Sequence, residues 1–348
     1  MKKTVALGLC LLLLLTGCQR TEKKTYQAHF LSLFDTVTTI VGFADSKEEF
    51  SELAGQIQQK LEEYHQLYDI YNDYEGVNNL KTVNDNAGIA PVAVDGRIID
   101  LLRFSMEQYE ATGGAVNVAF GPVLALWHDY REAGLEDPGA AALPPMELLT
   151  QALAHTDIED VIVDEEASTV YLSDPSMRLD VGAVAKGYAV EQVARYFEDE
   201  GVQHLLLSVG GNVRAIGGKL EDKTEKEIPW EIGIQNPDKS SSESELLSLL
   251  ITGRSVVSSG IYGRYYTVDG VQYHHIIDPA TLMPSAYFAQ VTIVCPDSGL
   301  ADALSTAVFN MPLDEGLAYI ESLPDVEALW VMKDGTLAHS SGFESLIK

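Results

Sequence analysis

The sequence predicts an α+β fold, in which helices pack against a largely antiparallel sheet and a small helical insertion is added. Two observations predict it. Short apolar runs typical of strands occur in groups, and the segments with helical spacing are grouped as well, whereas strands and helices alternate strictly in a parallel sheet. With 348 residues, 46% of them hydrophobic, the chain can bury a sizeable core, which excludes a disordered or fibrous protein.

The first half of the chain is predicted to be mainly helical. Residues 34–43 alternate apolar and hydroxyl side chains, which is typical of an opening strand. Three segments have the apolar spacing of helices, namely residues 47–64, 96–111 and 146–154. We expect an irregular loop at residues 68–86, which are rich in Tyr, Asn and Asp, and a surface insertion at residues 132–145.

The second half is predicted to contain most of the strands. Short apolar runs indicate strands at residues 161–163, 170–172, 178–180 and 205–209. A helix is expected at residues 182–200, stopped by Gly201. The tail from Leu300 has the pattern of two helices, a strand and a hairpin.

The N-terminus has the pattern of an exported protein. Residues 1–18 combine two lysines with an apolar run shorter than the roughly 20 residues that a transmembrane helix needs. The run ends in Leu15-Thr16-Gly17-Cys18, which resembles the bacterial lipobox; the alternative is a plain secretory signal with a chance cysteine. We therefore expect lipidation at Cys18 and a protein that is lipid-anchored to the cell membrane on its extracytoplasmic side.

These patterns predict the domain organisation. The expected parts are a signal peptide at residues 1–17, a tether at residues 18–28, and one domain at residues 29–348 with a helical insertion at roughly 96–156. Cys10 would leave with the signal peptide and Cys18 would be lipidated, so that Cys295 remains alone. Because Cys295 ends an apolar run, we expect a buried thiol rather than a reactive one.

The charge balance restricts the binding partners. The chain has 52 acidic residues against 23 Lys plus Arg, a formal charge of −29, which becomes −31 once Lys2 and Lys3 leave with the signal peptide. Nucleic acids and anionic lipid surfaces are bound by clustered Lys and Arg, so this balance argues against a nucleic-acid partner. An anionic small molecule is still compatible with a locally positive pocket.

Common catalytic motifs are absent, and four unusual clusters remain. The sequence contains no phosphate loop, no dinucleotide-binding glycine motif, no HExxH and no GxSxG. The first cluster, RLDVGAVAKGY at residues 178–188, places Asp180 at the end of a strand and Lys186 in the first turns of a helix. A helix N-terminus attracts anions such as a pyrophosphate. The alternative is that Asp180 only caps the helix and Lys186 is solvated.

The second cluster contains a pair of glycines, and the third contains a pair of histidines. Gly210 and Gly211 follow an apolar strand, where they indicate a turn or, less strongly, close approach of a flat ligand. His274 and His275 point to opposite faces of a strand, so only one can face a given site. His275 and Asp278 are candidates for an acid/base residue and its orienting partner, and the alternative is a purely structural histidine.

The fourth cluster holds a possible metal site. Asp302 and Thr306 are four residues apart and share one helix face. Carboxylate and hydroxyl oxygens suit a magnesium ion, which takes few protein ligands. The alternative is that Asp302 caps the first turn and Thr306 bonds back to a carbonyl.

Read in order, the clusters resemble the ApbE family of FAD:protein FMN transferases. The resemblance runs from Phe34-Asp35-Thr36 to about Met311, and its most specific parts are residues 179–190, 210–214, 275–279 and 301–307. It implies a T-fold-like, duplicated sheet, Mg²⁺ as cofactor and FAD as substrate. The implied reaction is attack by a Ser or Thr hydroxyl of an acceptor protein, which carries a flavinylation motif, on the phosphate of the FMN half, with release of AMP.

The resemblance also implies roles for individual residues. The metal ligands would be Asp302, Thr306 and the backbone carbonyl of Ala183, and His275 would act in the transfer. Positions that match FAD contacts are Phe34, Tyr71, Ala115, Val116, Asn117, Asp180, Lys186 and Ile276. Three positions depart from the family pattern: Asn117 stands where members usually have Asp, Asp35 where they have Gly, and Ala183 where they often have a second Gly.

Two other functions fit the same residues. One is a magnesium-dependent FAD pyrophosphatase, in which water replaces the acceptor hydroxyl and FMN and AMP are released. The other is a non-catalytic, exported flavin-binding lipoprotein. The pair of Asp302 and Thr306 argues against the latter, because binding alone requires no activated phosphate.

Overall fold

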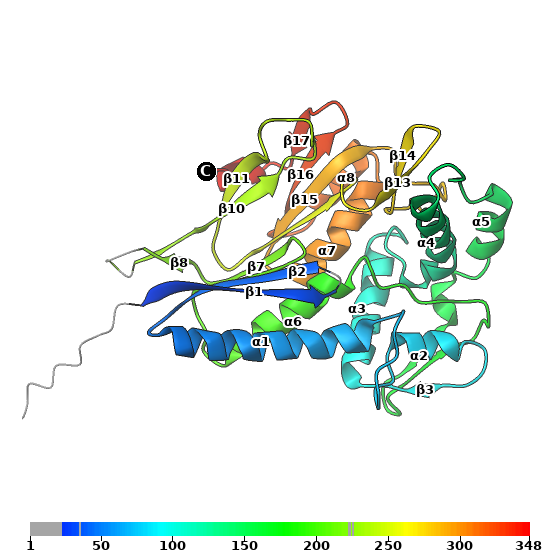
Figure 1. The fold of residues 1–348 in the computed structure, drawn as a ribbon, viewed down its shortest axis with the longest axis horizontal. Coiled ribbons are helices and arrows are strands. Elements are labelled where there is room, and N and C mark those ends of the chain that lie inside the picture. The colour runs from blue at the N-terminus through cyan, green and yellow to red at the C-terminus, as the bar shows by residue number, and fades with distance from the viewer. Residues whose placement is uncertain (1–22, 35, 222–223, 225) are drawn as a thin grey trace, which may run out of the picture.

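An eight-stranded antiparallel sheet is the centre of the computed structural model, which describes residues 23–34, 36–221, 224 and 226–348 (Figure 1). The strand order is β1-β2-β6-β7-β12-β15-β16-β17. The bounds are β1 Lys24–Leu33, β2 Thr36–Ala44, β6 Leu205–Val209, β7 Asn212–Ile216, β12 Ser255–Gly260, β15 Phe288–Cys295, β16 Glu327–Met332 and β17 Leu337–His339. The predicted α+β class is confirmed.

The N-terminal predictions are only partly covered by this structure. The predicted signal peptide at residues 1–17, Cys18 and the first residues of the predicted tether lie outside the described residues, as does Asp35. From Lys24 on, the segment predicted as tether belongs to the sheet, because β1 pairs along its length with β2. No helix in the part of the chain that the structure describes is long and apolar enough to cross a membrane.

The sheet consists of two halves with the same order of elements. The first half comprises β1, β2, α1 (Lys47–Tyr68), α6 (Ala185–Asp199), β6 and β7, and the second comprises β12, β15, α7 (Ser298–Ala307), α8 (Leu313–Glu321), β16 and β17. Each half therefore reads strand, strand, helix, helix, strand, strand. Pairing of β7 with β12 joins them into one sheet, which is the duplicated T-fold-like arrangement that the resemblance implied.

Insertions interrupt both halves. Between α1 and α6 lie α2 (Leu80–Asp85), β3 (Val92–Ala93), α3 (Gly96–Ala111), η1 (Val118–Phe120), α4 (Gly121–Glu136), α5 (Met146–Leu153), η2 (Ile158–Asp160), β4 (Val161–Asp164) and β5 (Thr169–Leu172). Strands β3, β5 and β4 form a small sheet of their own. The remaining elements are β8 (Lys219–Leu220), β9 (Glu227–Ile228), β10 (Trp230–Gln235), β11 (Glu245–Ile251), β13 (Tyr265–Val268), β14 (Val271–His274), η3 (Val308–Asn310) and η4 (Phe343–Leu346).

The helices of both halves cover one face of the sheet, as Figure 1 shows for α1 and α6. Phe50, Ile57 and Leu61 of α1 pack with Val190 and Phe197 of α6 against the first half. Helix α7 covers β12 and β15, while β10 and β11 cover the opposite face. Every residue of β15 is consequently buried, including Cys295, which confirms the predicted buried thiol.

Three predicted segments differ from the structure. Residues 68–86 are not wholly irregular, because Asn79 and Thr82 form a reciprocal capping box that starts α2. Residues 178–180 do not form a strand; the backbone N–H of Asp180 instead donates to the carbonyl of Val118, which ties this loop to η1. Helix α4 extends to Glu136, into the predicted surface insertion.

The glycine pair of the second cluster forms a turn, as the stronger of the two interpretations predicted. Gly210 and Gly211 have φ angles of +57° and +90°, and Val209 pairs with Asn212 across them. Both central residues of such a tight hairpin need positive φ, which glycine adopts without a steric penalty. A Cβ on Gly210 would also lie 2.7 Å from Thr36 Oγ1.

Candidate active site at the junction of the two halves

The carboxylate of Asp302 lies against the N-terminus of α6. Its Oδ2 accepts a hydrogen bond of 2.8 Å from the backbone N–H of Gly187, and its Oδ1 lies 3.7 Å from the ammonium group of Lys186. Asp302 is 4% exposed. Helix α7 itself is capped by Asp297, so Asp302 does not cap its own helix but supplies a negative charge to the positive end of α6.

The close approach of α6 and α7 depends on Gly187. A Cβ at this position would lie 2.3 Å from the carbonyl oxygen of Ser298 and 2.4 Å from the Cβ of Asp302. The absence of a side chain lets the two backbones approach closely enough for the Gly187–Asp302 hydrogen bond. The sequence was compatible with either a solvated or a ligand-binding side chain at Lys186. In the structure its ammonium group lies beside the buried carboxylate of Asp302.

The two neighbouring histidines have different surroundings, as the alternation along a strand predicts. His274 is buried: its Nε2–H donates to the Ser285 carbonyl at 3.0 Å and its ring packs edge-on against Phe309. His275 is exposed, and its Nδ1–H donates to the carbonyl of Arg264 at 3.2 Å. Desolvation of the ring by the surrounding protein lowers the pKa of His275, and the positive charge of Arg264 lowers it further. The ring is therefore neutral at pH 7, with Nε2 available as a proton acceptor.

Asp278 does not orient His275. Its buried carboxylate accepts hydrogen bonds from the backbone N–H of Ala280 at 2.8 Å and the hydroxyl of Thr281 at 3.2 Å. It thus closes the turn that follows β14. The predicted side-chain pair of His275 and Asp278 is absent, because the carbonyl of Arg264 occupies the place of the orienting partner.

Asp180 and Tyr71, like His275, lie within the electrostatic influence of Arg264. Asp180 accepts a hydrogen bond of 2.9 Å from the N–H of Gly182, in the loop before α6, and does not cap the helix. Burial raises the pKa of Asp180, and Arg178, His128 and Arg264 act against that rise. Tyr71 packs on His128 with ring centroids 5.6 Å apart. Burial raises the pKa of Tyr71, and the nearby negative charge of Asp180 raises it further.

A model of the ApbE family matches residues 34–330 of this chain. The chain belongs to the ApbE family. It is 33% identical to the FAD:protein FMN transferase of Treponema pallidum over 77% of this chain and 75% of the relative, and 29% identical to that of Vibrio cholerae over 96% of both. Among solved structures it is similar to the ApbE protein of Thermotoga maritima, with a TM-score of 0.79 and 27% identity. The match covers 93% of this chain and 100% of the other.

A second solved structure, the flavin transferase ApbE from Vibrio cholerae, has a TM-score of 0.73 and 26% identity, with 93% of this chain and 100% of the other covered. The fold similarity therefore extends over both halves of the sheet and the insertions. The resemblance deduced from the four clusters is confirmed at the level of the family.

The ApbE-family positions around Asp302 fit a magnesium ion chemically. Ala183 packs against the apolar cluster that includes Ala303 and Ala307, two residues of the helix that carries Asp302 and Thr306. A carboxylate, a hydroxyl and a carbonyl are the hard oxygen donors that Mg²⁺ prefers. No group of three or more His, Cys, Asp or Glu suited to a metal occurs among the described residues, so an ion here would keep water or substrate oxygens in its other positions.

The other predicted flavin contacts lie in two apolar clusters that both include residues of α7. Phe34 and Ala115 pack against it and Val116 is buried within it, whereas Ile276 is buried in the cluster that contains Ala301 of α7. Phe34 has a φ of +51° and packs edge-on against His65, with ring centroids 5.4 Å apart. The cluster that holds Val116 also includes Ala303 and Ala307 of α7.

Asn117, which departs from the family pattern, has a local structural role. Its Oδ1 accepts from the N–H of Ala119 at 2.8 Å and its Nδ2 donates to the carbonyl of Thr156 at 2.9 Å. The second bond requires an amide, because a carboxylate has no hydrogen to donate. Asn117 therefore connects η1 to the segment that follows α5, which an Asp could do only in part.

Sequence reasoning assigned no role to the arginines around His275. Each of the other arginines in the described residues has a carboxylate within ion-pair distance, but the guanidinium groups of Arg178 and Arg264 have none. Together with Arg131 they influence the pKa of Tyr71, so they lie near this ring. In a chain of charge −29, two unpaired arginines are a signal for an anionic ligand.

Proposed function

We propose that this ApbE-family chain is a magnesium-dependent FAD:protein FMN transferase, which attaches FMN through a phosphoester to a Ser or Thr of an acceptor protein and releases AMP. The observation that supports it most is the buried carboxylate of Asp302, held at the N-terminus of α6 beside Lys186. Such an arrangement suits a metal-bound pyrophosphate, because helix N-termini and ammonium groups both attract phosphate oxygens. The curated relatives carry the same activity in their names.

His275 is proposed to accept the proton of the acceptor hydroxyl. Its Nδ1–H is engaged with Arg264, so the lone pair of Nε2 is free in the neutral ring. As the proton moves to Nε2, the hydroxyl oxygen forms a bond to the phosphorus of the FMN half. The bond from that phosphorus to the bridging oxygen breaks, and AMP leaves with the electron pair.

Three cationic side chains are proposed to neutralise the phosphates. Lys186 lies beside Asp302, while Arg178 and Arg264 have no carboxylate partner among the described residues and lie near Asp180. Asp302, Thr306 and the carbonyl of Ala183 would hold Mg²⁺, which when bound supplies Lewis-acid stabilisation of the developing charge. These groups would give the locally positive field that the overall composition lacks.

We also propose that the protein is anchored to the cell membrane by lipid at Cys18, on the extracytoplasmic side. Five residues, Gln19 to Lys23, separate Cys18 from β1. Even fully extended they reach only about 18 Å. A lipid at Cys18 would hold the start of the sheet near the bilayer. Cys18→Ser should release the protein from the membrane fraction and abolish metabolic labelling with palmitate; unchanged fractionation and labelling would contradict this anchor.

One experiment tests the activity. Purified protein lacking residues 1–18 is incubated with FAD, MgCl₂ and a candidate acceptor domain, and the acceptor mass and free FMN are followed. An acceptor that gains FMN, together with AMP, supports the transferase. Free FMN alone would instead indicate the pyrophosphatase, and unchanged FAD would indicate a flavin-binding protein without turnover.

A further inference from the structure

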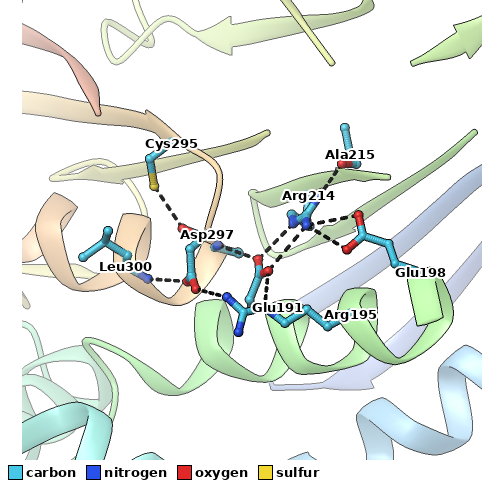
Figure 2. A network of polar contacts seen from close by, with 9 residues as sticks. Glu191, Arg195, Glu198, Arg214, Ala215, Cys295, Asp297 and Leu300 are labelled. Carbon is cyan, nitrogen blue, oxygen red and sulfur yellow. Dashed lines mark hydrogen bonds and ion pairs between the residues drawn. The ribbon is translucent and has the colours of Figure 1, made fainter. Parts of the chain in front are cut away.

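The middle of α6 contains a buried carboxylate, Glu191, that contacts three elements. It is 2% exposed. Its oxygens accept hydrogen bonds from Nε of Arg214 on β7 and Nε of Arg195 on α6, each at 2.9 Å, and from the backbone N–H of Ser298 on α7 at 2.8 Å. Figure 2 shows the arginines and the start of α7 converging on this side chain.

The contacts of Glu191 join the two halves of the sheet. Helix α6 and strand β7 belong to the first half, and α7 belongs to the second. Arg195 extends the link, because its Nη2 donates to Oδ2 of Asp297 at 2.6 Å, while Oδ1 of Asp297 caps α7 through the N–H of Leu300. The N-terminus of α7 is therefore attached to α6 twice, through Glu191 directly and through Arg195.

The Glu191 contact and the Asp302 contact lie one helical turn apart. On α6, Glu191 follows Gly187 by four residues, and on α7, Asp302 follows Ser298 by four. Glu191 holds Ser298, and Gly187 holds Asp302. A shift of α7 along α6 by a fraction of the 5.4 Å helical pitch would break both contacts together. The position of Ser298 consequently sets the position of Asp302.

Stability alone does not explain a carboxylate at this place. Burying a charged group carries a desolvation penalty that paired arginines only roughly repay, and apolar residues of similar size often stabilise a fold equally well. What the directional hydrogen bonds add is a single register between two helices. In this fold, that register determines where the carboxylate of Asp302 lies relative to Lys186 and Ala183.

We propose that Glu191 is a positioning residue, which fixes the N-terminus of α7 on α6 and thereby holds Asp302 in the geometry that binds the divalent cation. The inference rests on the proposed function in one respect, namely that Asp302 is a metal ligand. Outer groups that orient metal ligands typically change metal affinity about 10- to 100-fold when they are substituted.

Glu198 provides a matched control on the same helix. It also accepts from Arg214, at 3.2 Å, but no hydrogen bond or ion pair connects it to α7 in the described residues. Glu191→Gln and Glu198→Gln each remove one negative charge next to Arg214. Only the first leaves one acceptor oxygen, beside an NH2 donor, for the N–H of Ser298 and both arginines together, so only the first should affect the metal site.

The test measures binding of Mg²⁺ alone by isothermal titration calorimetry, and of Mn²⁺ by electron paramagnetic resonance, without FAD or acceptor. We expect Glu191→Gln to raise the Kd of the cation about 10-fold or more, and Glu198→Gln to leave it within about 2-fold of the parent protein. In turnover assays Glu191→Gln should raise the magnesium concentration for half-maximal rate, with kcat largely recovered at saturating magnesium.

A second variant covers the case in which Glu191→Gln does not fold. Asp297→Asn keeps an oxygen to cap Leu300 but weakens the ion pair with the half-exposed Arg195, and we expect it to raise the Kd a few-fold. Equal affinities of the Glu191, Asp297 and Glu198 variants would overturn the positioning role. If Asp302→Asn binds Mg²⁺ as tightly as the parent, the assignment of Asp302 as a metal ligand is overturned, and with it the positioning role, whereas FMN transfer to an acceptor is judged by the separate activity assay.

Discussion

The backbone N–H of Gly187 donates a hydrogen bond of 2.8 Å to the carboxylate of Asp302, a residue 115 positions further along the chain. This contact joins the helix that begins within the Asp-Val-Gly-Ala-Val-Ala-Lys-Gly segment to the helix of the Ala-Asp-Ala-Leu-Ser-Thr-Ala segment. The two most specific motifs of the sequence therefore form one site, because the duplicated fold places α6 beside α7 at the junction of its halves.

Gly187→Ala should destabilise the protein and abolish transfer. The added Cβ would meet the carbonyl of Ser298 and the Cβ of Asp302 at less than 2.5 Å, so α6 and α7 must separate. Overpacking of this kind typically costs about 1–3 kcal/mol, measurable as a lower free energy of unfolding in urea. Gly55→Ala in α1 is the control, since a Cβ there has open space around it; an equal effect of the two substitutions would contradict the close helix contact.

Asp302→Ala should abolish turnover, and excess EDTA should have the same effect on the parent protein. Both changes remove the metal that the proposed reaction requires to stabilise charge on the phosphates. The assay is FMN incorporation into an acceptor domain with FAD in excess. Asp314→Ala in the first turn of α8, away from this junction, is the control. Full activity of Asp302→Ala would show that the metal assignment is wrong.

His275→Ala should slow transfer by roughly 100-fold while changing FAD affinity much less. Because the pKa of His275 is lowered, the ring stays neutral as the pH falls. The rate should therefore not decrease between about pH 8 and pH 6, whereas an imidazole with the ordinary pKa of about 6.5 would lose its basic form there. Substitution of the exposed His29 serves as control. Equal losses of rate and FAD affinity would argue against a role in proton transfer.

Arg264→Gln should weaken FAD binding, and high salt should weaken it in the parent protein. A charge-assisted hydrogen bond to phosphate contributes about 1.5–3 kcal/mol, so the Kd for FAD should rise at least 10-fold. Flavin fluorescence titration measures this directly. Arg103→Gln is the matched control, because Arg103 pairs with Glu165 on the surface. An unchanged Kd would remove Arg264 from the phosphate site.

Asn117→Asp, which restores the residue usual in the family, should destabilise this protein. The carbonyl of Thr156 would lose its donor and face a carboxylate instead, whereas the bond to the N–H of Ala119 would persist. An unsatisfied buried polar group costs about 1–3 kcal/mol. Thermal unfolding of the two proteins measures the change, and an equal or higher melting temperature for the variant would contradict the structural role of Asn117.

The local sequence pattern was sufficient to predict the bounds of those elements that depend only on their own spacing of apolar residues. The helix at residues 96–111 and the strand at residues 205–209 begin and end where the spacing of apolar residues predicts. Helix α2 was not predicted, because its start depends on a capping box within a polar segment. The segment at residues 178–180 was predicted as a strand because alternation is local, whereas its actual partner, Val118, belongs to a remote turn.

The sequence by itself determined the family, the α+β class and the residue types of the site, because motif spacing on one helix or strand is a local property. Only the tertiary structure decided how those residues are connected. It separated Asp278 from His275 and placed Asp302 at the N-terminus of α6. It also placed Arg264 near Asp180, with no carboxylate at ion-pair distance in the part of the chain that the structure describes. The acidic composition excluded a basic surface, but a positive site needs only a few cations brought together, and folding rather than composition brings them there.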